Sequence, residues 1–560
     1  MRTTLKGAGM GVGQGISRRG FIKVAGVGAV GLTLGGLLAA CAAPQGEGAT
    51  DEDAATTPAI NSQVIVAMAP GSEPPAGFDP FVSWGCGEHQ HEPLIQSTLI
   101  TTTASMGFQN DLATGYSVSE DGLTWTFSIR DDVRFSDGTV LSAADVAFTL
   151  NGIIASEGAE ADLSMVDTAE APDASTVLLH LNRPFNALLY TLAVVGIVPA
   201  HAHGADYGER PIGSGRYVLE QWDKGQQVIL AANPDYYGEK PKIERLIVVF
   251  MAEDAALAAA RSGQVDLAYT SATYSGQELA GYSMFAAKSV DSRGISLPTM
   301  PPGVTLDENG QEVEAGNAVT ADIAIRRALN YGVDRELLVQ NVLNGYGSVA
   351  YSVGDGMPWS SKDMQVATDV SKARAFLTDA GWTLGSDGIF EKVGQRASFE
   401  LWYPANDSVR QALASEFSNQ VKEVGIEVVV KGGSWDELYA HMFTDPILWG
   451  WGSNAPVELY NLNHSKGNSN FAGYSNATTD RYLLEALATP ALEDSYPLWQ
   501  KAQWDGSVGV APQGEATWVW FANIDHLYFA RDGLVIAQQK PHPHGHGWSI
   551  VNNIDQWSWE

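Results

Sequence analysis

The chain has 560 residues, of which 65 are Asp or Glu and 33 are Lys or Arg, so its formal net charge at pH 7 is -32. A field of that sign disfavours binding to nucleic acid and to anionic lipid surfaces. Two cysteines exclude a disulfide framework. The length is too great for one core, so we expect two or three compact units that burial of apolar surface stabilises.

The first 40 residues are organised like an export signal. A basic stretch, SRRGFIK (17–23), precedes an uncharged run rich in Gly and Ala (24–40). The paired arginines resemble a twin-arginine signal, whose machinery exports folded proteins. A transmembrane anchor is the alternative, but the run is short and weakly apolar for crossing about 30 Å of hydrocarbon.

The uncharged run ends on Leu38-Ala39-Ala40-Cys41, which resembles a bacterial lipobox. This resemblance implies removal of residues 1–40, attachment of lipid to the Cys41 thiol and an extracytoplasmic, lipid-anchored protein. The alternative is a chance cysteine within a cleaved signal. The polar stretch 41–61 cannot bury a core, and we expect it to be a flexible linker before a fold that begins near Ser62.

The remaining chain alternates strand and helix patterns. Residues 64–67 are typical of a strand, and Trp125, Phe127 and Ile129 alternate as on a half-buried strand. Ser142 is expected to cap a helix, which a strand over 176–181 follows. Helical spacing recurs further on, with Thr320 as the expected cap of the first of three segments, at 320–343, 369–382 and 408–424. The pattern predicts an α/β protein with mixed sheets.

Six motifs in chain order carry a more specific resemblance. They are LTWTFSIRDDVRFSDGTVLSAADVAFT, PIGSGRY, NPDYYGEKPKIERL, ADIAIRRALNYGVDRE, FLTDAGW and FAGYSNATTDRYL. Together they resemble the family 5 extracellular solute-binding proteins, which serve oligopeptide, dipeptide and nickel ABC importers. The resemblance implies a two-lobed flytrap fold with an extra subdomain on the first lobe. The implied division is lobe I at 62–110, 212–296 and 520–560, the extra subdomain at 111–211, and lobe II at 297–519.

Two histidine sets are candidates for binding a ligand or metal. His89 and His91 alternate in WGCGEHQHEP (84–93), which places both on one face of an extended segment, with Cys86 nearby. A polar loop without a ligand is the alternative reading. The second set, His542, His544 and His546, lies in a Pro- and Gly-rich turn, where structural hydrogen bonding is favoured over metal binding.

Lobe II supplies further candidates around Gly450-Trp451. Peptide-binding relatives of this kind follow the matching Gly-Trp with an Asp that pairs with the peptide amine, whereas this chain has neutral Asn454. Glu458 is a candidate replacement. His464 lies where nickel-binding relatives place a ligand-contacting His, so His89, His91 and His464 form the candidate metal set. Aromatic candidates for contacting a ligand, some of which we expect in the core instead, are Trp84, Trp402, Tyr403, Trp449, Trp451 and Tyr474.

The sequence holds no G-x-S-x-G elbow, H-E-x-x-H, P-loop or C-x-x-C motif, so we expect a binding protein and no catalytic residues. The predicted function is capture of a small peptide or peptide-like solute and its delivery to an ABC permease and its ATPase subunits. A nickel or other transition-metal chelate is the alternative ligand, with the metal as cargo and no resident cofactor. An extracytoplasmic enzyme or an adhesin is a remote alternative. We expect a monomer with no nucleic-acid partner.

Overall fold

The computed structural model describes residues 62–560 except 83–84, 87–88, 157, 307–310 and 546. The export signal, Cys41, the linker, Trp84 and His546 therefore lie outside the described residues, as do the side chains of Cys86 and His89. None of the helices in the described part combines the length and the apolarity that a membrane span requires.

Lobe I is built on a seven-stranded sheet in the order β10-β11-β12-β1-β13-β26-β14. In its central strand, β1, the side chains of Val64, Val66 and Met68 are fully buried. The helix α3 (Glu253–Arg261) packs on the sheet through Ala256 and Leu257. The strand bounds are β1 Gln63–Met68, β10 Tyr217–Asp223, β11 Gln227–Ala232, β12 Arg245–Phe250, β13 Leu267–Thr270, β14 Tyr282–Ala287 and β26 His526–Arg531.

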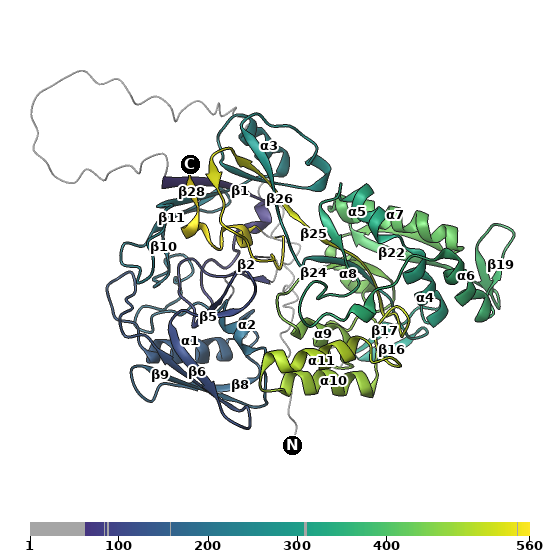
Figure 1. Cartoon of the computed structure of the whole chain (residues 1–560), viewed down its shortest axis with the longest axis horizontal. Coiled ribbons are helices and arrows are strands. Elements are labelled where there is room, and N and C mark those ends of the chain that lie inside the picture. The colour runs from purple at the N-terminus through teal and green to yellow at the C-terminus, as the bar shows by residue number, and fades with distance from the viewer. Residues whose placement is uncertain (1–61, 83–84, 87–88, 157, 307–310, 546) are drawn as a thin grey trace, which may run out of the picture.

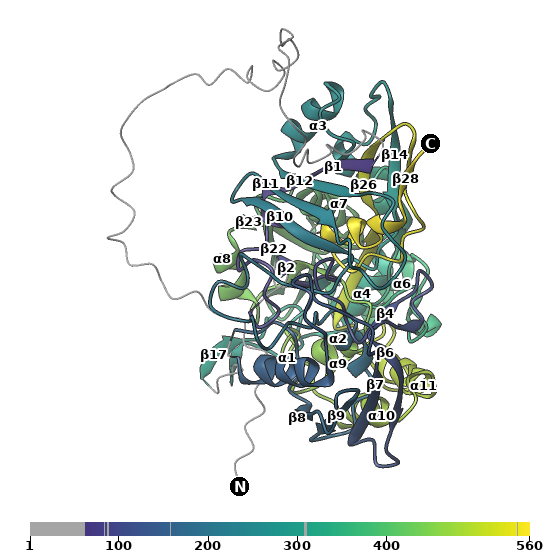
Figure 2. The ribbon, with the colours of Figure 1, turned by 90° about the vertical axis from the view of Figure 1, so that its left-hand side faces the viewer.

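The extra subdomain holds a four-stranded antiparallel sheet in the order β6-β7-β9-β8. Trp125, Phe127 and Ile129 of β7 are buried, which confirms the predicted alternation, and Ser142 caps α1 in a capping box with Asp145. Figure 2 shows this layer below the seven-stranded sheet. The bounds are β6 Ala113–Val118, β7 Thr124–Ile129, α1 Ala143–Ala155, β8 Val166–Glu170, β9 Thr176–Leu181 and α2 Leu188–Leu192. A separate strand pair, β4 Ile100–Thr102 with β5 Phe108–Asn110, precedes this subdomain in the chain.

Lobe II is built on a six-stranded sheet in the order β18-β25-β15-β24-β22-β23. Helices surround this sheet, and Figure 1 shows the whole lobe beside lobe I and the extra subdomain. The strand bounds are β15 Ser292–Ser296, β18 Gly347–Val349, β22 Ser398–Pro404, β23 Glu427–Gly433, β24 Ile447–Trp451 and β25 Trp518–Ile524. The helix bounds are α4 Ile323–Gly332, α5 Arg335–Val342, α6 Val370–Asp379, α7 Ser408–Val424, α8 Trp435–His441, α9 Val457–Asn463, α10 Ala477–Ala488 and α11 Leu492–Gln503.

Short strand pairs decorate the surface of this fold. Their bounds are β2 Gly85–Cys86 with β3 His89–Gln90, β16 Gly303–Leu306 with β17 Glu312–Ala315, β27 Leu534–Val535 with β28 Ser558–Trp559, and the triplet β19 Thr383–Leu384, β20 Phe390–Lys392 and β21 Gln395–Arg396.

The segment predicted as one helix from Thr320 forms two helices. Asp322 is the cap of α4, because its side chain accepts a hydrogen bond from Ala324 N, and Asp334 caps α5 in the same way from Leu337 N. Thr320 is buried and donates its hydroxyl to Pro298 O instead. The capping prediction at Thr320 was therefore wrong, since an aspartate two residues further along meets the free amides of the first turn.

The chain crosses between the two large sheets twice, from β14 to β15 and from β25 to β26. The segments 292–296 and 520–524, expected in lobe I, pair with strands of the lobe II sheet, because β15 pairs with β24 on one side and β25 on the other. A third segment lies against the first crossing: Val290 N donates to His542 O and His542 N donates to Lys288 O, both at 2.9 Å. The other predicted domain boundaries stay predictions.

Candidate functional site

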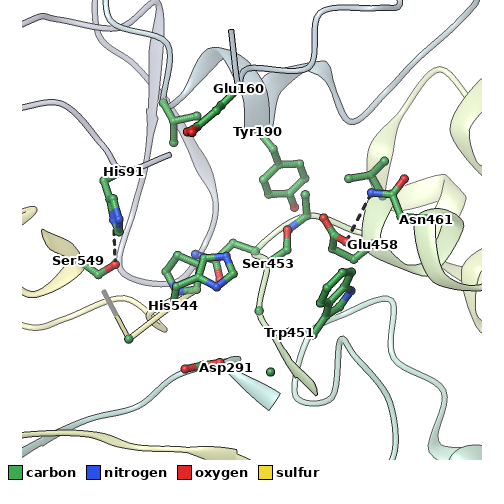
Figure 3. A pocket seen from close by; sticks show the side chains of 18 of the residues that line it. His91, Glu160, Tyr190, Asp291, Trp451, Ser453, Glu458, Asn461, His544 and Ser549 are labelled. Carbon is green, nitrogen blue, oxygen red and sulfur yellow. Dashed lines mark hydrogen bonds between the residues drawn. The ribbon is translucent and has the colours of Figure 1, made fainter. Parts of the chain in front are cut away.

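A cavity of about 930 Å³ lies between the lobes. Lobe I and the extra subdomain contribute His91, Glu160, Asp162, Tyr190, His544 and Ser549 to its wall. Lobe II contributes Asp291, Arg293, Arg410, Trp451, Asn454 and Glu458. Figure 3 shows Tyr190 and Glu458 directed into it from opposite sides. Residues that are hundreds of positions apart in the chain therefore form one wall. The volume of the cavity is that of a site for a small ligand.

The extra subdomain also contacts lobe II directly, away from the two crossings. Asn186 Nδ2 donates to Ala486 O and to Thr489 O, both at 2.8 Å. Asn186 is buried, so this contact is shielded from water. The two parts of the molecule that border the cavity are thus connected both by the crossing segments of the chain and by this hydrogen-bonded contact.

The floor of the cavity is a cluster of four charged side chains. Arg293 of β15 donates to both carboxylate oxygens of Asp291, and Arg410 of α7 donates to Asp407, the N-cap of the same helix. Arg293 and Asp291 are 8% and 4% exposed. The strand β15 and the helix α7 supply these residues because β15 begins at the end of the sheet where β22, the strand before α7, finishes.

Burial and the neighbouring charges shift the pKa values of the side chains in this cluster. Burial alone would raise the pKa of Asp291, but the Arg293 charge and a hydrogen bond from His526 hold it well below its ordinary value. Burial, followed by the charge of Arg293, lowers the pKa of Arg410 to about 10. In the described part of the chain, the Nε atoms of Arg293 and Arg410 have no hydrogen-bond partner. The arginines therefore retain donor capacity for a ligand.

The opposite part of the wall is acidic. Glu458 of α9 accepts a hydrogen bond from Asn461 Nδ2 at 3.4 Å, the dashed contact in Figure 3. Glu458 is half-buried on the cavity wall, and burial, with a smaller effect of Asp162, raises its pKa to about 7. A cationic ligand group beside Glu458 would favour the ionised form.

Aromatic side chains of lobe II line one side. Trp449 stacks on Phe471 with ring centroids 4.7 Å apart and on Trp435 at 6.3 Å. Trp449 donates its indole N–H to Ser296 Oγ at 3.0 Å. The indole N–H of Trp451 is buried, and no acceptor for it lies among the described residues. Trp451 can therefore offer both an apolar surface and one donor.

Asn454 lies on the cavity wall beside the segment that carries His542 and His544. Its Nδ2 donates to Pro541 O at 3.1 Å, while its buried Oδ1 has no donor within the described residues. Gly452, two residues earlier, allows this approach, because a Cβ there would lie 1.8 Å from Pro543 O. Asn454 thus connects the lobes and leaves one acceptor for a ligand N–H.

Of the residues predicted to contact a ligand, the cavity wall includes His91, Trp451 and Asn454, and also Trp449, Glu458 and His544. His91 is buried and faces Ser549 Oγ at 3.5 Å. Their roles in binding stay predictions. The backbone of His89 lies in β3, next to this region in the chain, and Trp84 lies outside the described residues.

Four other predicted residues lie away from the cavity. Trp402 stacks on His441 with centroids 4.2 Å apart, Tyr403 is buried in the lobe II core, and the Tyr474 hydroxyl is 2.9 Å from Thr479 Oγ1. His464 is buried at the end of α9, stacks on Tyr460 and accepts from Lys466 N through Nδ1. Burial lowers the pKa of His464. The fold therefore does not bring His464 to His91.

Metal-ligating side chains do not gather into a resident site in the described part of the chain. Within the described residues, no group of three or more His, Cys, Asp or Glu side chains is arranged to hold a metal ion. The charged floor was missed in the sequence, although "DSRGIS" offered a signal: two charges beside a buried strand need partners or a function.

The chain was then compared with known proteins. The family model of bacterial extracellular solute-binding proteins, family 5 Middle, matches residues 107–473. Protein XP55 of Streptomyces lividans is 32% identical over 517 residues, 88% of each chain. The oligopeptide-binding protein AppA of Bacillus subtilis is 26% identical over 477 residues, 80% of this chain and 85% of AppA. The structure of NikZ from Campylobacter jejuni in complex with Ni(L-His) covers 89% of this chain and 99% of NikZ, with a TM-score of 0.70 and 26% identity.

The two-lobed fold with a cavity between the lobes is that of an extracytoplasmic binding protein. The chain belongs to the family 5 extracellular solute-binding proteins of ABC importers. The resemblance drawn from the six sequence motifs is thereby confirmed, and so is the predicted fold class.

Proposed function

We propose that the protein captures a small peptide or peptide-like solute with a free carboxylate and delivers it to an ABC permease by lobe closure. The observation that carries this proposal is the pair of guanidinium groups of Arg293 and Arg410 on the floor of the cavity. Guanidinium groups bind carboxylates through paired hydrogen bonds. The similarity to AppA supports a peptide ligand.

The remaining wall fits the rest of a peptide-like molecule. Asn454 Oδ1 and the Trp451 indole offer an acceptor and a donor for amide groups, and Glu458 offers a carboxylate for a cationic end. Glu458 thus takes the role of the Asp that peptide-binding relatives carry after Gly-Trp. Contacts with both lobes favour the closed state, which is how ligand binding drives closure.

The site is extracytoplasmic, and we propose that residues 1–40 direct export and that lipid on Cys41 retains the mature chain at the membrane. The linker 42–61 would then keep the binding lobes near the permease. ATP hydrolysis takes place on partner subunits, and the chain itself acts as a monomeric binding protein without catalytic residues.

A metal chelate is the second candidate ligand, because His91 and His544 lie on the wall and NikZ was solved with Ni(L-His). In that case the chelator supplies most of the metal ligands, since the described residues hold no site of their own.

Native mass spectrometry of the purified chain from Ala42 onward, compared with the same sample after denaturation, tests the proposal. A mass excess of a few hundred daltons that fragments into amino acids is the expected result. A nickel isotope pattern would instead favour the chelate. Turnover of a peptide, ester or redox substrate by the purified chain would overturn the binding function.

A further inference from the structure

Behind the cavity floor, a buried row of polar side chains continues from Asp291 into the crossing segments. His526 Nε2 lies 3.2 Å from Asp291 Oδ2, and His526 Nδ1 lies 3.1 Å from His542 Nδ1. His542 Nε2 lies 3.2 Å from Gln539 Oε1. Asp291, His526 and His542 are 4%, 7% and 0% exposed, so the row is shielded from water. A hydrogen-bonded row of this kind must have a consistent set of donors and acceptors.

The far end of the row fixes the orientation of Gln539. The Trp557 indole can only donate, and its Nε1 donates to Asn553 Oδ1 at 2.9 Å. The same oxygen accepts from Gln539 Nε2 at 2.7 Å, and Asn553 Nδ2 donates to Gln538 O. Gln539 must therefore present its amide nitrogen to Asn553 and its carbonyl oxygen, Oε1, to His542.

The carbonyl oxygen of Gln539 then fixes the tautomer of His542. Because Oε1 can only accept, His542 Nε2 carries a hydrogen. Burial, together with the neighbouring charges of His526, His91 and Lys540, lowers the pKa of His542 well below its ordinary value, so the ring is neutral. A neutral ring with a hydrogen on Nε2 has a lone pair on Nδ1. His542 Nδ1 therefore accepts a hydrogen bond from His526 Nδ1.

His526 must then donate from both of its ring nitrogens. Its Nδ1–H is directed to His542, and its Nε2 faces the carboxylate of Asp291. The positive charge of Arg293 keeps this carboxylate ionised. An ionised carboxylate only accepts, so Nε2 also carries a hydrogen. The imidazole with hydrogens on both nitrogens is the imidazolium cation.

This cation changes the charge of the cavity floor. Arg293, Arg410 and His526 are three cations, whereas Asp291 and Asp407 are two carboxylates. Two further charged pairs nearby cancel: Lys288 with Asp525 at 2.8 Å, and Lys540 with Glu92. His91 and His544 also lie on this wall, and an imidazole can only add positive charge. The wall between His526 and the cavity is thin, because a Cβ at Gly545 would lie 3.3 Å from His526 Nε2. At least one positive charge in this buried cluster is therefore left for a ligand to neutralise.

We propose that His526, fixed as an imidazolium by the row from Trp557 to Asp291, is a positioning residue that makes the cavity floor select an anionic ligand group, such as a carboxylate, over its neutral amide. The inference rests on the proposed function for the ligand, but the charge of His526 can be measured without any ligand. His526 donates a hydrogen bond to Asp291, and Asp291 accepts hydrogen bonds from Arg293, so His526 fixes the position of the Arg293 guanidinium group. The surplus positive charge attracts the anion.

Neutron crystallography of the soluble chain in D2O at neutral pH tests the charge. We expect deuterium on both ring nitrogens of His526 and on Nε2 alone of His542. Deuterium on only one nitrogen of His526 would overturn the proposal. This measurement uses the wild-type chain, so it stands even if a substitution at His526 impairs folding.

Titration calorimetry with trialanine and trialanine amide tests the selection. His526→Gln keeps a donor for Asp291 and removes the charge, and we expect it to reduce the preference for trialanine over the amide by about tenfold. An unchanged preference would overturn the selection. His201→Gln, which removes an exposed His–Asp pair at 2.7 Å in the extra subdomain, is the matched control and should leave both affinities unchanged. A wild-type chain that binds neither probe would contradict the peptide function, while the neutron map still decides the charge of His526.

Discussion

Arg293 and Arg410 direct their guanidinium groups at the same glycine. A Cβ on Gly450 would lie 2.7 Å from Arg293 Nη1 and 2.1 Å from Arg410 Nη2. The two side chains come from a strand and a helix that are more than a hundred residues apart, and Asp291 and Asp407 hold them in place. The absence of a side chain at residue 450 therefore allows two cations to meet at the cavity wall.

Gly450→Ala should weaken ligand binding while preserving the fold. The methyl group displaces at least one guanidinium from its aspartate, which we expect to lower the affinity for trialanine about tenfold or more and to destabilise the chain by roughly 1–3 kcal/mol. Titration calorimetry and thermal unfolding measure the two effects. Gly115→Ala in β6, where a Cβ meets nothing within 4 Å, is the control. Equal affinities of Gly450→Ala and wild type would contradict the role of the arginine pair.

Ionisation of Glu458 should make the free energy of unfolding depend on pH. Its pKa is about 7 in the folded chain and near 4.5 when unfolded, so between these values the folded state binds more protons. The free energy of unfolding therefore falls as pH rises from 4.5 through 7. We expect Glu458→Gln to be more stable than wild type at pH 8 by roughly 1–2 kcal/mol, less than the full shift because cavity water screens the charge, and equally stable at pH 4.

Denaturant midpoints at both pH values check the effect of Glu458→Gln. Glu391→Gln, at an exposed position in β20, serves as the control and should show no comparable gain at pH 8. A Glu458→Gln midpoint that follows the wild type at every pH would show that burial does not perturb this carboxyl group.

His91 and His464 should differ in their effect on a chelate. His91 lines the cavity, whereas His464 is buried beside Tyr460 at the end of α9. If the ligand is a nickel chelate, His91→Ala should weaken binding of Ni(L-His) by about tenfold, and His464→Ala should leave it unchanged while lowering the unfolding temperature. Calorimetry with Ni(L-His) measures this. The opposite ranking would mean that the loop after α9 reaches the ligand.

Cys41→Ala should release the protein from the membrane. Lipid on this thiol is the only attachment that we propose, so the variant is expected in the soluble extracytoplasmic fraction. Fractionation and immunoblotting measure the distribution, and Cys86→Ala is the matched control that keeps the anchor. Retention of Cys41→Ala in the membrane pellet would contradict the lipobox reading.

The sequence was sufficient for the family, the fold class and several local elements. The alternation of Trp125, Phe127 and Ile129 and the Ser142 cap depend on contacts within a few residues, and both were predicted correctly. The six family motifs predicted the two-lobed architecture, because their order along the chain matches that of the family over most of its length. The same motifs predicted that Asn454 and Trp451 contact a ligand; both lie on the cavity wall, and the contact itself stays a prediction.

The tertiary structure alone decided which charges and histidines meet. Arg293 with Arg410, and Asp291 with His526 and His542, are brought together by strand pairing and by the two crossings, at separations where local sequence patterns carry no information. The same holds for His464, which was predicted to contact a ligand by analogy with nickel-binding relatives, whereas the fold packs it on Tyr460, away from the cavity wall. Local order follows from short-range backbone preferences, whereas a binding site between two lobes depends on long-range packing that only the folded chain defines.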